Sequence, residues 1–185
     1  MKTVKNIFII LFFVILSEYT WAYDFSAVHE GQTIYYNITS DTEPYTVEVT
    51  FQNTNYEEAF YTDFPIGSMI IPDYVMHNGK NYKVTAIAPF AFYGCDSLTE
   101  INLGNHIALI DFAAFYECSR LSIINIPHTV KRIGEAAFQH CSGITSMHIP
   151  DSVQTIEYFA FSYCTKLKTF TVGKNNTRFT VKEDI

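Results

Sequence analysis

Basic residues are scarce in this sequence of 185 residues. Twelve Lys and Arg stand against nineteen Asp and Glu, which gives a formal net charge of −7 at pH 7. A protein that binds nucleic acid needs a basic surface for the phosphates, so this balance argues against a nucleic-acid partner. Beyond residue 22 the sequence also lacks an apolar run of about 18 residues, the length of a transmembrane helix. We therefore expect a mature chain that does not span a membrane.

The sequence also lacks the short motifs that mark common active sites. It contains no Gly-rich phosphate loop, no Gly-x-Ser-x-Gly elbow and no Cys-x-x-Cys pair of the kind that binds zinc. We therefore expect no catalytic site, no cofactor, no metal site and no enzymatic activity. Hydrophobic residues make up 48% of the chain and charged residues 17%, which is material for a packed core rather than a signature of disorder.

The first 22 residues have the layout of a secretory signal peptide. Lys2 and Lys5 form a positive start, Ile7 to Leu16 is an unbroken apolar run, and Thr20 and Ala22 place small residues before a cleavage point. A membrane anchor is the alternative, but such a run reaches only about 15 Å as a helix, half the hydrocarbon thickness of a bilayer. We predict cleavage near Ala22 and a secreted or cell-surface location.

A spacing of 23 residues dominates the rest of the chain. The four cysteines, Cys95, Cys118, Cys141 and Cys164, are each 23 residues from the next. On this period seven more columns are apolar in all four copies, and in the first copy they are Val84, Ile87, Ala91, Phe92, Leu98, Ile101 and Leu103. One such unit cannot bury its own apolar face, whereas stacked units can. The period therefore predicts a solenoid of four repeats over residues 84–175.

Each repeat is expected to hold one short strand and one tight arc. Leu98, Ile101 and Leu103 carry the alternation of a strand, and its copies would stack in parallel about 4.7–4.9 Å apart. The Ala-Phe pair would lie on the opposite arc, where the small Ala lets the chain turn close to the core. The Phe rings would then stack on one another as an aromatic spine.

Strand geometry also selects the residues that face outward from this sheet. We call them the sheet face: Glu100, Asn102, Ile123, Asn125, Ser146, His148, Thr169 and Thr171. They are small and mostly polar, which suits a broad contact with a protein or a glycan better than a concave pocket for a small molecule. We take them as the candidate partner-binding residues, the alternative being a face that binds nothing. Exposed tyrosines of the preceding segment, among Tyr35, Tyr36, Tyr56 and Tyr61, are other candidate contacts.

The repeat follows a recognisable consensus. From Ala114 to Ile133 the sequence reads Ala-Phe-x-x-Cys-x-x-Leu-x-x-Ile-x-Ile-Pro-x-x-Val-x-x-Ile. This pattern resembles the BspA-like leucine-rich-repeat family, and Ile70-Ile71-Pro72, Asn78-Gly79 and Lys83-Val84-Thr85 resemble its customary lead-in. The resemblance implies a right-handed leucine-rich-repeat solenoid, α/β by class but mostly β and irregular. It also implies a secreted or surface protein that contacts or adheres to host matrix or other microbes.

The same resemblance implies that the cysteines are small buried residues with free thiols. Disulfides are the alternative, because stacking would bring neighbouring Cys Cα atoms to about 5 Å in a secreted chain. Side chains of one column point the same way rather than at each other, which favours free thiols. His140 beside Cys141 is the nearest approach to a catalytic pair, but adjacent side chains on an extended stretch point apart.

Residues 23–83 differ from the repeats, with nine acidic residues and two basic ones. Alternating runs predict strands at 33–38, 45–51, 68–71 and 82–87. Asn78-Gly79 predicts a hairpin between the last two strands. We expect this segment to be a β cap over the end of the solenoid, and a separate ligand-binding module is the alternative.

Residues 176–185 follow the last repeat as a polar tail or a partial cap. The stretch from Phe179 to Val181 could add a final short strand. Without it the last repeat leaves an open sheet edge that could pair with another chain. The alternative function is therefore a structural component of a surface assembly that self-associates through this C-terminal end.

Overall fold

The computed structural model describes residues 23–52 and 64–179, so the expected signal peptide lies outside the described residues. The described residues form strands and turns, with no helix among them. The strands are β1 (Phe25–His29), β2 (Gln32–Ser40), β3 (Thr46–Thr50), β4 (Gly67–Ile70), β5 (Tyr74–His77), β6 (Lys80–Ile87), β7 (Leu98–Asn102), β8 (Leu109–Ile110), β9 (Ile123–Asn125), β10 (Arg132–Ile133), β11 (Ser146–Ile149), β12 (Thr155–Ile156) and β13 (Thr169–Val172). Within these ranges, no helix could cross a membrane.

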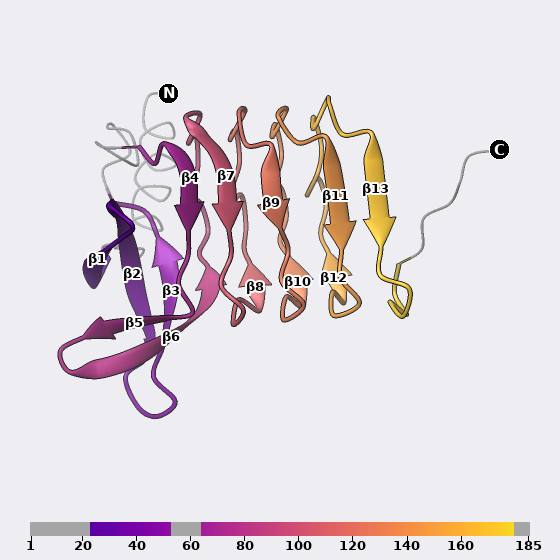
Figure 1. The fold of residues 1–185 in the computed structure, drawn as a ribbon. Helices are drawn as coiled ribbons and strands as arrows, with labels where there is room; N and C mark the ends of the chain where they lie inside the picture. The colour runs from indigo at the N-terminus through magenta and orange to yellow at the C-terminus, as the bar shows by residue number, and fades with distance from the viewer. Residues whose placement is uncertain (1–22, 53–63, 180–185) are drawn as a thin grey trace, which may run out of the picture.

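Strands of successive coils stack in two rows that run in opposite directions (Figure 1). The first row consists of the sheet β4-β7-β9 followed by the pair β11-β13. The second row continues from β6 through β8 and β10 to β12. From β7 onward in the first row and from β6 onward in the second, paired residues lie 23 positions apart, as with Glu100 and Ile123 or Ala86 and Leu109. The molecule is therefore a solenoid built mostly from β-strands and irregular turns.

The second row was not expected from the sequence. Its strands β8, β10 and β12 have two residues each, too few to show a period-2 alternation. Ile110 and Ile133 are fully buried in this row, directly above one another along the Ile87 column. Each of these coils thus contributes a second, very short strand, and the apolar column marks its position.

The phenylalanine column forms a continuous stack inside the coils, which confirms the predicted aromatic spine. Ring centroids lie 5.1 Å apart for Phe92 and Phe115, 5.2 Å for Phe115 and Phe138, and 5.4 Å for Phe138 and Phe161. All three pairs are within 3° of parallel. In the first three coils the Phe amide donates to the carbonyl of the column Ala in the next coil, as from Phe115 to Ala137 at 2.8 Å. The column Ala is buried at this contact.

The solenoid continues without a break into the segment expected to be the cap. β1, β2 and β3 form an antiparallel meander, and β3 then pairs in parallel with β6. In the first row, β4 pairs in parallel with β7. The expected boundary between residues 83 and 84 falls inside β6, so both rows begin in the preceding segment. That residues 23–83 cap the solenoid stays a prediction.

The Asn78-Gly79 turn joins β5 to β6, with His77 paired to Lys80. Both turn residues have positive φ, as this hairpin turn requires. The expectation that the turn joins the strands near 68–71 and 82–87 was wrong. β4 lies in the first row, and the short strand β5 between them is the partner of β6.

The last coil is less covered than the coils before it. Phe161 and Phe170 are half-buried, whereas their equivalents Phe138 and Met147 are 0% and 2% exposed. Among the described strands β13 has one neighbour, β11. The predicted final strand from Phe179 lies mostly outside the described residues, so this end of the sheet has a free edge within the described part.

Candidate functional site

The first row of strands presents the sheet face to solvent. Seven of its eight residues are exposed, and Glu100 is half-buried. In β11 the side chains of Ser146 and His148 are exposed while those of Met147 and Ile149 are buried. This is the alternation of a strand with one side on the core. The row therefore brings the eight predicted residues to one surface, from β7 to β13.

Neighbouring residues of the sheet face lie in register across the coils. Asn102 lies opposite Asn125, and His148 lies opposite Thr171, with 2.9 Å between the imidazole Nδ1 and the hydroxyl oxygen. Ile123 is 55% exposed and is the large apolar side chain of the face. An array of amide, hydroxyl and imidazole groups around one apolar side chain can contact a protein or a glycan.

Of the four tyrosines considered as alternative contacts, the two among the described residues do not lie on the surface. Tyr35 and Tyr36 are 8% and 0% exposed, so their assignment as contacts was wrong. Both sides of β2 are covered, because the Tyr36 ring stacks on Phe25 and the Tyr35 ring packs on Tyr23. Tyr56 and Tyr61 lie outside the described residues.

The four cysteines are buried, and their thiols are free, as expected. The Cys118 thiol donates to the carbonyl oxygen of Phe92 at 3.0 Å, and the next two cysteines make the same bond one coil further on. Burial raises the pKa of Cys164 to about 12 and raises the pKa of Cys141 well above its usual value. These thiols stay protonated near neutral pH, and a protonated thiol is a poor nucleophile.

The adjacent residues His140 and Cys141 lie in different surroundings. The thiol of Cys141 points into the core toward Phe115, while the His140 ring stacks on Tyr163 with 4.5 Å between ring centroids. Across residues 23–52 and 64–179, no three His, Cys, Asp or Glu side chains lie close enough to hold a metal ion.

The buried thiols are expected to resist alkylation until the protein unfolds. At about pH 8, near the ordinary pKa of a thiol, the raised pKa values leave little thiolate, and burial excludes the reagent. Iodoacetamide treatment followed by mass spectrometry should show no modified cysteine in the folded protein. Four modified cysteines should be found in denaturant without a reductant. Unmodified, disulfide-linked cysteines in the denatured sample would contradict the free-thiol assignment.

A second surface, which the sequence analysis missed, follows the cysteine column on the outside. In three coils the residue after the cysteine donates its amide to the carbonyl of the residue before it, at 2.7 Å each time. The pairs are Asp96 with Gly94, Ser119 with Glu117, and Ser142 with His140. This bond closes a γ-turn around each cysteine. The cysteine is buried, and its two neighbours lie toward solvent.

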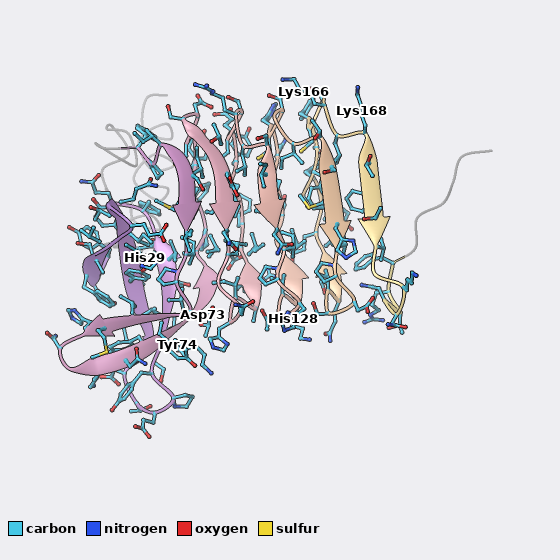
Figure 2. All side chains as sticks on the ribbon, viewed as in Figure 1. His29, Asp73, Tyr74, His128, Lys166 and Lys168 are labelled. Atoms are coloured by element: carbon cyan, nitrogen blue, oxygen red, sulfur yellow. The ribbon has the colours of Figure 1, made fainter. Side chains whose placement is uncertain are left out.

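These neighbours form two rows along the coils. The row before the cysteines is Gly94, Glu117, His140 and Tyr163, and the row after them is Asp96, Ser119, Ser142 and Thr165. Between the rows lies a shallow groove of about 370 Å³, which we call the arc groove. Figure 2 labels Lys166, which directly follows Thr165 of the row after the cysteines, at the arc of the last coil. Because the residue types differ from coil to coil, no column in the sequence marked these rows.

The stacked coils, each with a short strand in a parallel row, define a leucine-rich-repeat solenoid with an exposed sheet face. A family model described as BspA type leucine rich repeat region matches residues 53–182 with six copies. The chain therefore belongs to the BspA-type leucine-rich-repeat family, as its repeat pattern predicted. The match begins before residue 84, in keeping with the parallel pairing of β4 with β7.

Solved structures of bacterial leucine-rich-repeat proteins have a similar fold. One from Bacteroides ovatus is 30% identical with a TM-score of 0.59, over 80% of this chain and 41% of that protein. One from Bacteroides capillosus is 24% identical with a TM-score of 0.60, over 80% and 97%. The T. pallidum leucine-rich-repeat protein is 23% identical with a TM-score of 0.55, over 73% and 66%. No match was found among curated proteins. The family indicates a protein-interaction or surface module.

Proposed function

We propose that this protein is exported and acts at a surface as an adhesion module. It binds a host-matrix or microbial partner through the sheet face. The observation that carries this proposal is a row of seven exposed, mostly polar side chains on four successive strands, with the exposed Ile123 among them. The layout of residues 1–22 supports export with cleavage near Ala22. Residues 23–83 would act as the cap, and residues 176–185 as a tail or partial cap.

Substitutions on the sheet face are expected to weaken binding to the surface partner. Ile123→Ser removes the apolar contact and His148→Ala removes an imidazole, and each should lower affinity roughly tenfold if it is a central contact. The measurement is binding of the purified protein to immobilised matrix proteins, mucin glycans and whole microbial cells, at low and physiological salt. Tyr158→Ala is the control, because Tyr158 is 81% exposed and lies outside the sheet face.

Two results of this experiment would count against adhesion through the sheet face. One is equal binding by the Ile123→Ser variant and the Tyr158→Ala control. The other is binding that disappears at physiological salt, since screening of that kind indicates nonspecific contact between charges.

The free edge at β13 favours a second candidate function, a structural component that self-associates through its C-terminal end. The half-buried Phe170 and Val172 lie at this edge, and another chain would cover them. Light scattering over a wide range of concentration should then show oligomers that Phe170→Lys abolishes. Thr171→Lys places the same charge on the outward side of β13 and serves as the control. A monomer at every concentration would contradict this function.

A further inference from the structure

We propose that the arc groove binds an extended, neutral glycan chain. The proposal rests on the surface-binding function proposed above, and it adds a second site with a stated ligand class. The groove is lined by Asp96, Glu117, Ser119, His140, Ser142, Tyr163 and Thr165. It lies along the cysteine arcs rather than on the sheet face, so the two sites can be tested separately.

The backbone of the groove has little to offer an extended peptide. In the first three coils the amides before the cysteines are already bonded to the next coil. The Glu117 amide donates to the Gln139 carbonyl, and the His140 amide donates to the Ser162 carbonyl, both at 2.9 Å. The amides after the cysteines are bonded within the γ-turns. An extended peptide binds through main-chain hydrogen bonds at a free strand edge. Recognition in the arc groove must therefore come from side chains.

The side chains of the groove match the hydroxyl groups of a sugar. Two carboxylates, which accept hydrogen bonds, line it together with three hydroxyls, one imidazole and one phenol, which can donate and accept. The Asp96 carboxylate is held in place because Ser119 donates to it from Oγ at 2.7 Å and from the amide at 3.3 Å. Adjacent hydroxyls of a pyranose ring offer donors and acceptors at matching positions. The charges of Asp96 and Glu117 disfavour an acidic glycan.

Tyr163 adds an aromatic face at the end of the groove. Its ring lies parallel to that of His140, within 1°, and the residue is 63% exposed. Among the described rings, none stacks on its other face. The electron-rich face of an aromatic ring attracts the C–H groups on the apolar side of a sugar. A sugar ring can therefore stack on Tyr163 while its hydroxyls reach the neighbouring row.

The row of residues before the cysteines has large side chains at positions where the backbone conformation favours glycine. Gly94 has φ of 67°, and Glu117, His140 and Tyr163 have φ of 61°, 63° and 60° at the equivalent positions. The left-handed conformation is free of strain for glycine and disfavoured for other residues. Here the three side chains line the groove.

The length of the groove fits a short stretch of an extended polysaccharide. Four coils span roughly 15 Å at one strand spacing per coil. A pyranose unit in an extended chain repeats at a distance close to this spacing. Successive sugar rings can therefore contact successive coils. Each coil presents two residues, one before and one after its cysteine.

The test is calorimetric titration of the purified protein with three neutral linear hexasaccharides, cellohexaose, chitohexaose and mannohexaose. At least one should bind saturably, and acidic hexagalacturonate should not. Tyr163→Gly should weaken binding roughly tenfold or more, as expected for a central aromatic contact. Glycine is chosen because Gly94 holds the same conformation in the first coil, so the variant keeps its fold. Tyr158→Ala, outside the groove, should bind like the wild type.

Three outcomes overturn the proposal: no saturable binding of any neutral hexasaccharide, equal affinity of Tyr163→Gly and the wild type, or equal affinity for hexagalacturonate. The sheet-face variant Ile123→Ser separates this proposal from the adhesion function and should leave hexasaccharide binding unchanged. Adhesion that depends on Ile123 without hexasaccharide binding refutes the arc groove alone. Hexasaccharide binding that Tyr163→Gly weakens, without any effect of Ile123→Ser on adhesion, supports the groove and refutes the sheet face.

Discussion

The Phe138→Ala variant is expected to lose about 3–5 kcal/mol of unfolding free energy. Phe138 is fully buried, and its ring stacks on Phe115 on one side and on Phe161 on the other. Truncation therefore removes two ring contacts and leaves a cavity in the middle of the spine. A domain is typically stable by about 5–15 kcal/mol, so this single change should remove a large share of that stability.

Equilibrium denaturation in urea, followed by circular dichroism, measures this loss. Phe159→Ala is the matched control, because Phe159 is 61% exposed and has φ of 60°. Ala113 and Ala136 occupy the equivalent positions of the two preceding coils with φ of 49° and 55°, so alanine is accepted there. The control should stay within about 0.5 kcal/mol of the wild type. If Phe138→Ala unfolded at the wild-type midpoint, the ring stack would not stabilise the solenoid.

The core of this protein could be predicted because its residues repeat in columns. Equivalent residues of stacked coils share one environment, so the Phe92 and Cys95 columns each indicated a buried position without any knowledge of the fold. The outward positions of the strands followed from the same columns by alternation. The repeat period was therefore enough to predict the phenylalanine spine, the buried thiols and the exposure of the sheet face.

The features that sequence analysis missed are those that do not repeat or are too short to show a pattern. β8, with Leu109 and Ile110, has no alternation to detect. Tyr35 and Tyr36 are both buried because β2 is covered on its two sides, which alternation cannot anticipate. The hairpin partner of β6 was expected to be the strand at 68–71, which is β4. The partner is the short strand β5 instead.

The arc groove escaped detection for a related reason. Its first row begins with Gly94, the residue that a positive φ favours, and the later coils replace it with three unrelated side chains. A regular spacing within the sequence identifies positions whose side chains must be alike for the coils to pack. A surface whose residues differ along the solenoid becomes visible only when the γ-turns place them side by side.

The Ala137→Leu variant is expected to lose about 1–3 kcal/mol or more, because it overfills a fully buried position in the core. Ala137 is fully buried, between the equivalent residues Ala114 and Ala160, which are 0% and 3% exposed. Its carbonyl accepts the Phe115 amide at 2.8 Å, so the neighbouring backbone is held close to it. A larger side chain must stretch this hydrogen bond or leave its preferred rotamer.

The measurement is the same denaturation experiment, with Ala108→Leu as the control. Ala108 is exposed, and the next coil carries Lys131 at the equivalent position, so a larger side chain has room there. Ala108→Leu should therefore be near neutral while Ala137→Leu is destabilised. Equal midpoints for the two variants would mean that the coils can move apart at the arc. The spacing of the coils would then not depend on the small column, and the close backbone approach would be a result of the phenylalanine stack alone.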